Sequence, residues 1–341
     1  GTLLASGDPL PAGCVPHRTT ASQSVAFAAE GRIWALDPTG GRLSCVLQST
    51  SPGPFLWGPQ GDRVLLGDFQ IAGIARTPSY DANVPDPAIA AWGRPLGIAI
   101  VYAASDATHP QKLFLQDDSV ETLHDMPRGT YLDIAYHPSG LALASIIEQR
   151  GTQSIWFSTN EGTDAKRLVF TKTGTTFSDV GFTNSGRSLV YVAHHAEGYS
   201  EVHTIDLSRP DELISVWKGR VGRYVRSVWL SPDDTVYAAT EGTACADSRA
   251  VLLGEGSRAR PALPHDHRPT AVLGWLDQGT VLVGAGGCGA PMDLFSVAVG
   301  GDTKPAPLAT GVDTAASRAP APPAPTSIPK EVELATGSGK G

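Results

Sequence analysis

Two short segments carry residues that could bind a metal ion. His265, Asp266 and His267 form an HDH sequence in a loop flanked by prolines. Alternate residues of an extended segment can point to one side, so these side chains could share an ion. A metal site normally needs a third or fourth ligand from elsewhere in the chain, and no partner segment stands out. We treat this loop as a weak candidate and predict neither a metal nor another cofactor.

The second segment is HHAEGYSEVH, residues 194–203, which has the pattern of a hairpin. We expect His194 and His195 to be solvated turn residues, with metal binding as the less favoured alternative. The sequence contains no GxSxG elbow, Walker loop, HExxH pair or EF-hand loop. We therefore predict that the chain is not an enzyme and assign no catalytic residue.

A repeating unit must position any such residues. Each copy has an aromatic residue or Leu, then a short turn rich in Pro, Gly, Asn, Asp or Ser, then an apolar run. The anchors of the six copies are Trp57, Trp92, Tyr136, Phe182, Leu230 and Trp275, spaced 35, 44, 46, 48 and 45 residues apart. Such a period indicates stacked units that cannot bury their apolar faces alone.

The second half of each unit repeats as well. An alternating strand follows each anchor, as in Ile155–Phe157 and Val202–Ile205, and a polar turn with one more short strand comes next. Four short strands in about 45 residues are typical of one propeller blade. No segment shows the 3.6-residue period of an amphipathic helix. The sequence thus predicts an all-β propeller of four-stranded blades.

Three stretches resemble a known repeat: FTNSGRSLVYVAHHAEGYSEVHTIDLSRPDE (182–212), LSPDDTVYAAT (230–240) and YHPSGLALASI (136–146). They are similar to the TolB-type repeat, a relative of WD40 blades, in which an aromatic-Ser-Pro-Asp-Gly turn joins the first two strands. The resemblance covers about residues 24–310 and implies a β-propeller. No copy keeps Ser-Pro-Asp-Gly intact, and the Trp-Asp dipeptide of WD40 repeats is absent.

We favour seven blades, with six as the alternative. Strand-like segments at 24–29, 32–37 and 44–49 precede the first anchor and form three strands of a further blade. A terminal strand near Val312 or around Leu3 and Leu4 would complete that blade and leave no free sheet edge. The predicted organisation is an N-terminal segment (1–23), a propeller (24–316) and a Pro/Ala-rich tail (317–341).

The repeat also predicts residues that line the central channel. The position three residues before an anchor falls near the start of the innermost strand. In three consecutive blades it holds Asp133, Asp179 and Arg226, the last counted from Trp229. These side chains could form a charged arc at one channel mouth, although a solvated channel lining is the simpler interpretation.

The four cysteines favour two disulfides. Cys245 and Cys288 lie 15 and 13 residues after their anchors, in equivalent turns of neighbouring blades. Equivalent turns of adjacent blades lie close together, so a Cys245–Cys288 bridge is geometrically sensible, and Cys14 would then pair with Cys45. Disulfides indicate an oxidising compartment.

The overall composition narrows the functional classes. The formal net charge is −8 and basic residues do not cluster, which argues against nucleic-acid binding. No run of 18 apolar residues is present, so no membrane span is predicted. The chain begins with Gly1, which suggests a trimmed chain or a mature protein without its signal peptide. We expect an extracellular or cell-surface protein, with the periplasm as alternative.

The tail is the most unusual segment. Residues predicted to contribute to assembly are Pro320, Pro322, Pro323, Pro325, Ile328, Val332 and Leu334. The prolines favour polyproline II, and the apolar residues of 327–336 alternate with polar ones as in a strand. This strand could add to a blade edge of another copy and build oligomers or filaments.

Two functions therefore compete. The favoured one is a secreted, non-enzymatic propeller that acts as a protein-protein interaction or assembly module at the cell surface. The alternative is a channel-centred, metal-dependent hydrolase or lyase, or a propeller ectodomain that senses a small molecule.

Overall fold

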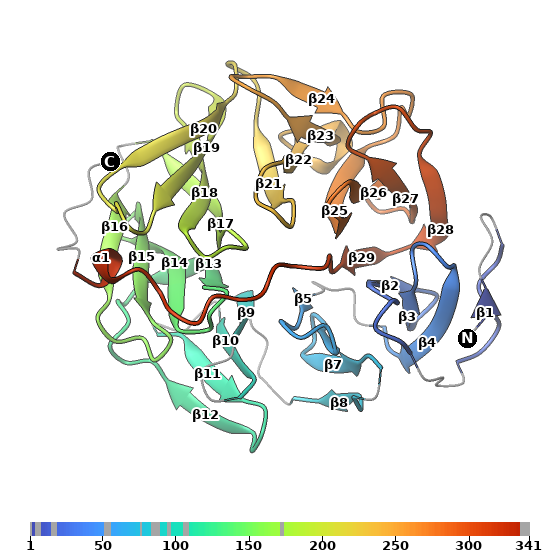
Figure 1. The fold of residues 1–341 in the computed structure, drawn as a ribbon, viewed down its shortest axis with the longest axis horizontal. Coiled ribbons are helices and arrows are strands. Elements are labelled where there is room, and N and C mark those ends of the chain that lie inside the picture. The colour runs from blue at the N-terminus through green and yellow to red at the C-terminus, as the bar shows by residue number, and fades with distance from the viewer. Residues whose placement is uncertain are drawn as a thin grey trace. The chain divides into compact units, whose positions relative to one another are not determined.

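The chain folds as an all-β propeller of seven blades (Figure 1). The computed structural model describes residues 2–3, 8–14, 19–50, 56–75, 77–82, 89–93, 97–104, 109–170 and 174–334. Six sheets have four strands each, and the blade that joins the chain ends has five. The seven-blade prediction is confirmed. Blades 1 to 7 follow the order of the chain.

Blades 1, 2 and 7 belong to a first compact unit, which also contains most of blade 6. Their strands are β1 (Thr2–Leu3), β2 (Val25–Ala29), β3 (Arg32–Leu36), β4 (Arg42–Gln48) and β29 (Thr314–Ser317) in blade 1; β5 (Leu56–Trp57), β6 (Arg63–Leu65), β7 (Gln70–Gly73) and β8 (Tyr80–Asp81) in blade 2; and β25 (Thr270–Asp277), β26 (Thr280–Gly286), β27 (Met292–Ala298) and β28 (Ala306–Val312) in blade 7. Blade 6 comprises β21 (Val225–Leu230), β22 (Tyr237–Glu241), β23 (Arg249–Leu253) and β24 (Ala259–Pro261), with the short 3-10 turn Cys245–Asp247 between β22 and β23.

Blades 3, 4 and 5 belong to a second unit, together with residues 321–334 of the tail. Their strands are β9 (Ile89–Gly93), β10 (Ala99–Ala103), β11 (Gln111–Phe114) and β12 (Ser119–Thr122) in blade 3; β13 (Thr130–Tyr136), β14 (Ala142–Gln149), β15 (Thr152–Thr159) and β16 (Lys166–Phe170) in blade 4; and β17 (Thr176–Phe182), β18 (Ser188–His195), β19 (Tyr199–Asp206) and β20 (Leu213–Lys218) in blade 5. The strands paired within these sheets are antiparallel, as hairpin-connected strands require.

Strands from both ends of the chain complete blade 1. β29 pairs with β2 on one side of the sheet, and β1 pairs with β4 on the other. Both terminal segments suggested by the sequence therefore contribute, the C-terminal one slightly beyond Val312. The Trp57 indole N–H donates to the Ala316 carbonyl at 3.1 Å, which ties blade 2 to this added strand.

The anchor residues contact the preceding blade, which explains why they recur. The Trp275 indole of blade 7 donates to the Trp229 carbonyl of blade 6 at 3.0 Å. The Phe182 ring of blade 5 lies edge-on to His137 of blade 4, with ring centroids 5.1 Å apart. Five apolar clusters lie between neighbouring blades, as the periodic sequence requires.

The tail differs from its prediction, because Lys330–Leu334 forms a short helix, α1, instead of a strand. Val332 lies on α1, whereas Ile328 precedes the helix by two residues, and both contact the same apolar cluster. Pro329 precedes the first helical residue, where its missing N–H costs nothing, and Glu331 and Glu333 lie in the first turn, where negative charge is favourable.

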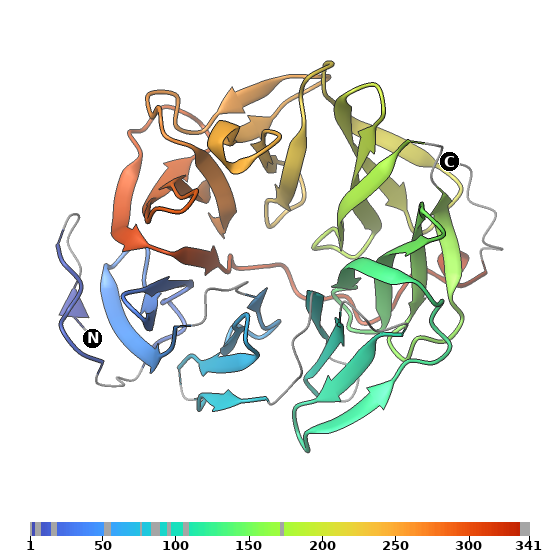
Figure 2. The same ribbon diagram turned by 180° about the vertical axis from the view of Figure 1, so that it is seen from behind.

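The tail packs on its own chain. Val332 is fully buried in the cluster between blades 4 and 5, and Ile328 packs against that cluster. The Lys166 ammonium donates to the Val332 carbonyl at 3.1 Å. Both views show α1 beside the strands of blade 4 (Figures 1 and 2). Pro320, Pro322 and Pro323 are exposed and Pro325 is partly buried, while residues 335–341 lie outside the described residues.

Candidate functional site

The structure places the predicted Asp133 and Asp179 side chains on the first strands of blades 4 and 5. The Val180 backbone N–H donates to Asp133 Oδ2 at 2.9 Å, so Asp133 reaches across to the neighbouring blade. Asp179 lies in a bulge of β17 with φ 53°, a left-handed conformation that Asp and Asn tolerate better than most residues. The bulge directs the Val180 amide at Asp133 and keeps the two carboxyl groups near each other.

This environment raises the pKa values of both carboxyl groups. Burial, and then the charge of Asp179, raise the pKa of Asp133 to about 7. Burial raises the pKa of Asp179 to about 6, although the Ser178 hydroxyl donates to its Oδ2 at 3.0 Å. Two carboxyl groups with such pKa values near neutrality can exchange a proton with a bound molecule.

A chain of hydrogen bonds continues from Asp179 into blade 5. Ser178 Oγ lies 2.8 Å from His194 Nε2, and His194 Nδ1 lies 2.9 Å from Ser200 Oγ. Both ring nitrogens of His194 are therefore engaged, and burial, followed by the charge of His195, lowers its pKa. The prediction of a solvated turn residue is wrong for His194, because β18 extends through it and places it between two serines.

Arg226, the third predicted channel residue, is exposed on β21. Its neighbour Val225 donates a backbone hydrogen bond to Ser200 Oγ at 3.1 Å, so the start of β21 touches the same chain. The charge of Asp179 acts on Asp133. The channel role of all three residues remains a prediction.

A cavity of about 490 Å³ opens between blades 4 and 5. Phe170, Phe177, Tyr191 and Tyr199 provide aromatic lining, and His195, Glu201 and His203 provide polar groups. Within the described ranges, these last three are the one group of His, Cys, Asp and Glu residues arranged closely enough to hold a metal ion. His195 also departs from its prediction, since it is half-buried and its ring stacks on Tyr199.

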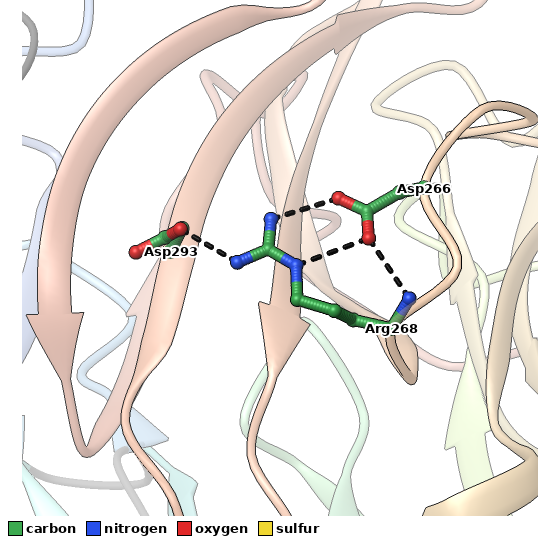
Figure 3. A network of polar contacts seen from close by, with 3 residues as sticks. All are labelled: Asp266, Arg268 and Asp293. Atoms are coloured by element: carbon green, nitrogen blue, oxygen red, sulfur yellow. Dashed lines mark hydrogen bonds and ion pairs between the residues drawn. The ribbon is translucent and has the colours of Figure 1, made fainter.

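The HDH loop has a different organisation from the one expected. His265 and His267 are exposed, whereas Asp266 binds the Arg268 guanidinium at 2.8 Å. Figure 3 shows Arg268 held between the carboxylates of Asp266 and Asp293. Hydrogen bonding to Arg268 lowers the pKa of Asp266. The Asp266 oxygens are therefore bound to Arg268, and the loop contributes a structural contact between blades 6 and 7.

Both predicted disulfides are present. Cys14 bonds to Cys45 in β4, and Cys245 bonds to Cys288. The second bridge joins the β22–β23 turn of blade 6 to the β26–β27 turn of blade 7. This is the relation that the equivalent repeat positions predicted.

The sequence alone did not identify the group of His195, Glu201 and His203. The EVH sequence of residues 201–203 could have grouped Glu201 with His203, because residues two apart in a strand share a face. Placing His195 beside them also requires the hairpin register, in which Ala193 pairs with Glu201 and Tyr191 with His203. The turn length between β18 and β19 was not fixed by the repeat.

None of the helices in the described part of the chain is long and apolar enough to cross a membrane. No protein-family model matches the sequence, and no curated protein matches it. Solved structures share its fold at low sequence identity, and they therefore indicate its architecture alone.

Three solved structures illustrate the likeness. TolB from Acinetobacter baumannii is 13% identical, with a TM-score of 0.52 over 87% of this chain and 67% of that one. An oligogalacturonate lyase in complex with manganese is 11% identical, with a TM-score of 0.61 over 83% of this chain and 88% of that one. A puromycin-hydrolyzing peptidase of Mycobacterium tuberculosis is 14% identical, with a TM-score of 0.57 over 89% of this chain and 56% of that one. The fold of this chain is that of a TolB-like β-propeller.

Proposed function

We propose that this protein is an extracytoplasmic propeller that binds a partner protein, and that the outer edge of blade 5 receives an extended segment of that partner. The observation that carries this proposal is the exposure of Leu213 and Ile214, at 44% and 50%, on the edge strand β20. In the sheet order β20 lies last, after β19. Natural edge strands are usually protected by charge, Pro or bulges, so two adjacent exposed apolar residues suggest a binding edge.

The apolar surface continues beyond the strand. Val221, which follows β20, is 75% exposed, the largest exposure among the large apolar side chains of the described residues. An added strand would take its affinity from main-chain hydrogen bonds to β20 and its specificity from contacts with these side chains. A segment with alternating apolar residues matches this surface.

The two disulfides support the proposed location. Bridges between cysteines 31 and 43 residues apart persist in oxidising compartments, such as the cell exterior or the periplasm. The tail offers less support for self-assembly, because Val332 is buried within its own chain. We therefore propose a different protein as the partner.

Site-specific photo-crosslinking tests the edge. A crosslinking residue at Ile214 should give one discrete product of unequal subunits in the cells that export the protein. The matched control is Val120, which is 51% exposed on β12, the edge strand of blade 3. Equal products from both positions, or a product of two identical chains, would contradict the proposal. In the protein that carries the crosslinking residue at Ile214, Leu213→Lys should abolish the product while leaving the urea midpoint unchanged.

The carboxyl pair favours a second candidate function, acid–base catalysis. Asp133 and Asp179 have pKa values near 7 and 6, suited to proton transfer at neutral pH. One of the similar folds is an oligogalacturonate lyase, so oligogalacturonate is a reasonable first substrate. Turnover by the wild type that is lost in Asp133→Asn would support this candidate. Equal rates in both proteins would exclude Asp133 as its acid or base.

A further inference from the structure

We infer that His195, Glu201 and His203 form a Zn²⁺ site in the cavity between blades 4 and 5. The three ligand atoms, one from each side chain, all lie within 4.8 Å of one another. Glu201 Oε1 is 2.9 Å from His195 Nε2 and 3.5 Å from His203 Nε2. Two imidazoles and one carboxylate form a ligand set typical of zinc sites that keep an open coordination position.

The distances suit a tetrahedral ion with little rearrangement. Bonds of about 2.0–2.1 Å at tetrahedral angles place neighbouring donor atoms about 3.3 Å apart. The separations of Glu201 Oε1 from the two histidine nitrogens, 2.9 and 3.5 Å, lie on either side of that value. The two histidine nitrogens lie within 4.8 Å of each other.

The hairpin explains why these residues meet. Tyr191, Ala193 and His195 share a face of β18, and their register partners on β19 are His203, Glu201 and Tyr199. Glu201 lies opposite the small side chain of Ala193, which leaves space between the two histidines. The group is therefore fixed on two paired strands, which hold ligands more firmly than a loop does.

Neighbouring rings orient the two imidazoles. Tyr199 stacks on His195 with centroids 4.6 Å apart, and Tyr191 lies 5.3 Å from His203. His203 is 7% exposed, and its Nε2 lies 3.5 Å from Glu201 Oε1. A bound ion would engage the buried imidazole and use the negative charge of Glu201.

The charge environment favours a cation at this position. Glu201 Oε1 lies close to both His195 Nε2 and His203 Nε2, so its carboxylate places a negative charge beside the two imidazoles. Lys218 on β20 carries the positive charge that opposes a cation here. Lys218 is the register partner of Glu201, and its ammonium lies 5.3 Å from the Tyr199 ring centroid.

The fourth position faces the cavity. Phe170 of blade 4 and Phe177 of blade 5 line the space beside the three ligands, and Glu197 lies at its edge. An ion held by three protein atoms would bind water there. The metal site lies in the cavity and does not depend on partner binding at the β20 edge, although Leu213 borders both.

Calorimetry on the full, oxidised, tag-free chain tests the site. We expect one Zn²⁺ per chain in the wild type and at least a tenfold loss of affinity in His195→Gln and in Glu201→Gln. The matched control is the double variant His265→Gln/His267→Gln, which should bind as the wild type does. Wild-type affinity in both site variants, or loss of binding only in the control, would overturn the proposal.

Cobalt provides a second measurement that does not depend on stability. Co²⁺ bound to the wild type should give the visible absorption of a four-coordinate ion, and Glu201→Gln should lose it. Circular dichroism and urea midpoints identify variants that fail to fold, which matters most for the buried His203. A folded Glu201→Gln protein with an unchanged cobalt spectrum would also overturn the site.

Discussion

At the residue scale, proton affinity is set by the blade interface. Asp133 accepts hydrogen bonds from two backbone amides, those of Val180 and Ile134, yet its pKa remains about 7. Burial and the nearby Asp179 therefore outweigh both amides. The sequence placed these carboxyl groups at equivalent repeat positions, but it could not give their protonation. The protonation of these carboxyl groups depends on the bulge of β17, which no residue pattern in the sequence predicted.

Asp179→Asn removes the charge of this side chain and keeps its shape. The folded pKa values of both carboxyl groups lie above their unfolded values, so the native state binds more protons between about pH 4 and 7. Their contribution to stability is therefore lost as pH rises through that window. Asn tolerates the left-handed backbone and can accept the Ser178 hydrogen bond. We expect the variant to exceed the wild type by about 1–3 kcal/mol at pH 8, a value discounted for partial solvent screening.

Urea unfolding at pH 8 and pH 4.5 measures this difference. The advantage of the variant should shrink at the lower pH, where the native wild-type pair holds its protons. Histidines outside the Asp179–Ser178–His194 hydrogen-bond chain keep their surroundings in the variant, so their effect cancels in the comparison. An advantage that grows on acidification would have the wrong sign. Carboxyl NMR should also show a lower pKa for Asp133 in the variant, because the Asp179 charge is gone.

At the element scale, the repeat predicted the strands well and the tail poorly. Trp57, Phe182 and Trp275 each contact the blade before their own, so the local pattern reports a contact that recurs in the fold. The tail lies outside the repeat, and its apolar spacing fits either a strand or a helix. Packing decided between them, because Val332 fills a buried position between blades 4 and 5. Sequence periodicity could not show that this position existed.

Val332→Asp should release the tail without unfolding the propeller. A carboxylate at a fully buried apolar position is costly, and undocking α1 avoids that cost. Hydrogen exchange should then rise across residues 326–334 and remain unchanged in β14 and β18. Glu331→Gln is the matched control, since Glu331 is exposed on the same helix. Faster exchange in the core strands would show that the tail supports the whole unit.

At the scale of the whole molecule, covalent bonds strengthen contacts that the repeat already makes. Cys245–Cys288 joins equivalent turns of blades 6 and 7, and Cys14–Cys45 fixes the N-terminal segment to blade 1. Cys45 is buried in the cluster between blades 7 and 1, and Cys14 packs against that cluster. The bridges therefore close loops around apolar contacts, and they restrict the unfolded chain more than they shape the folded one.

Removing either bridge should lower stability by a similar amount. The closed loops span 43 and 31 residues, and the chain-entropy model gives about 4 kcal/mol for each. Because the cost grows only with the logarithm of loop length, the two values should differ little. We expect the Cys245→Ala/Cys288→Ala and Cys14→Ala/Cys45→Ala pairs to show lower urea midpoints than the wild type. Reduction of the wild type should lower its midpoint below that of either pair, whereas an unchanged midpoint would mean that the blades hold these turns without covalent help.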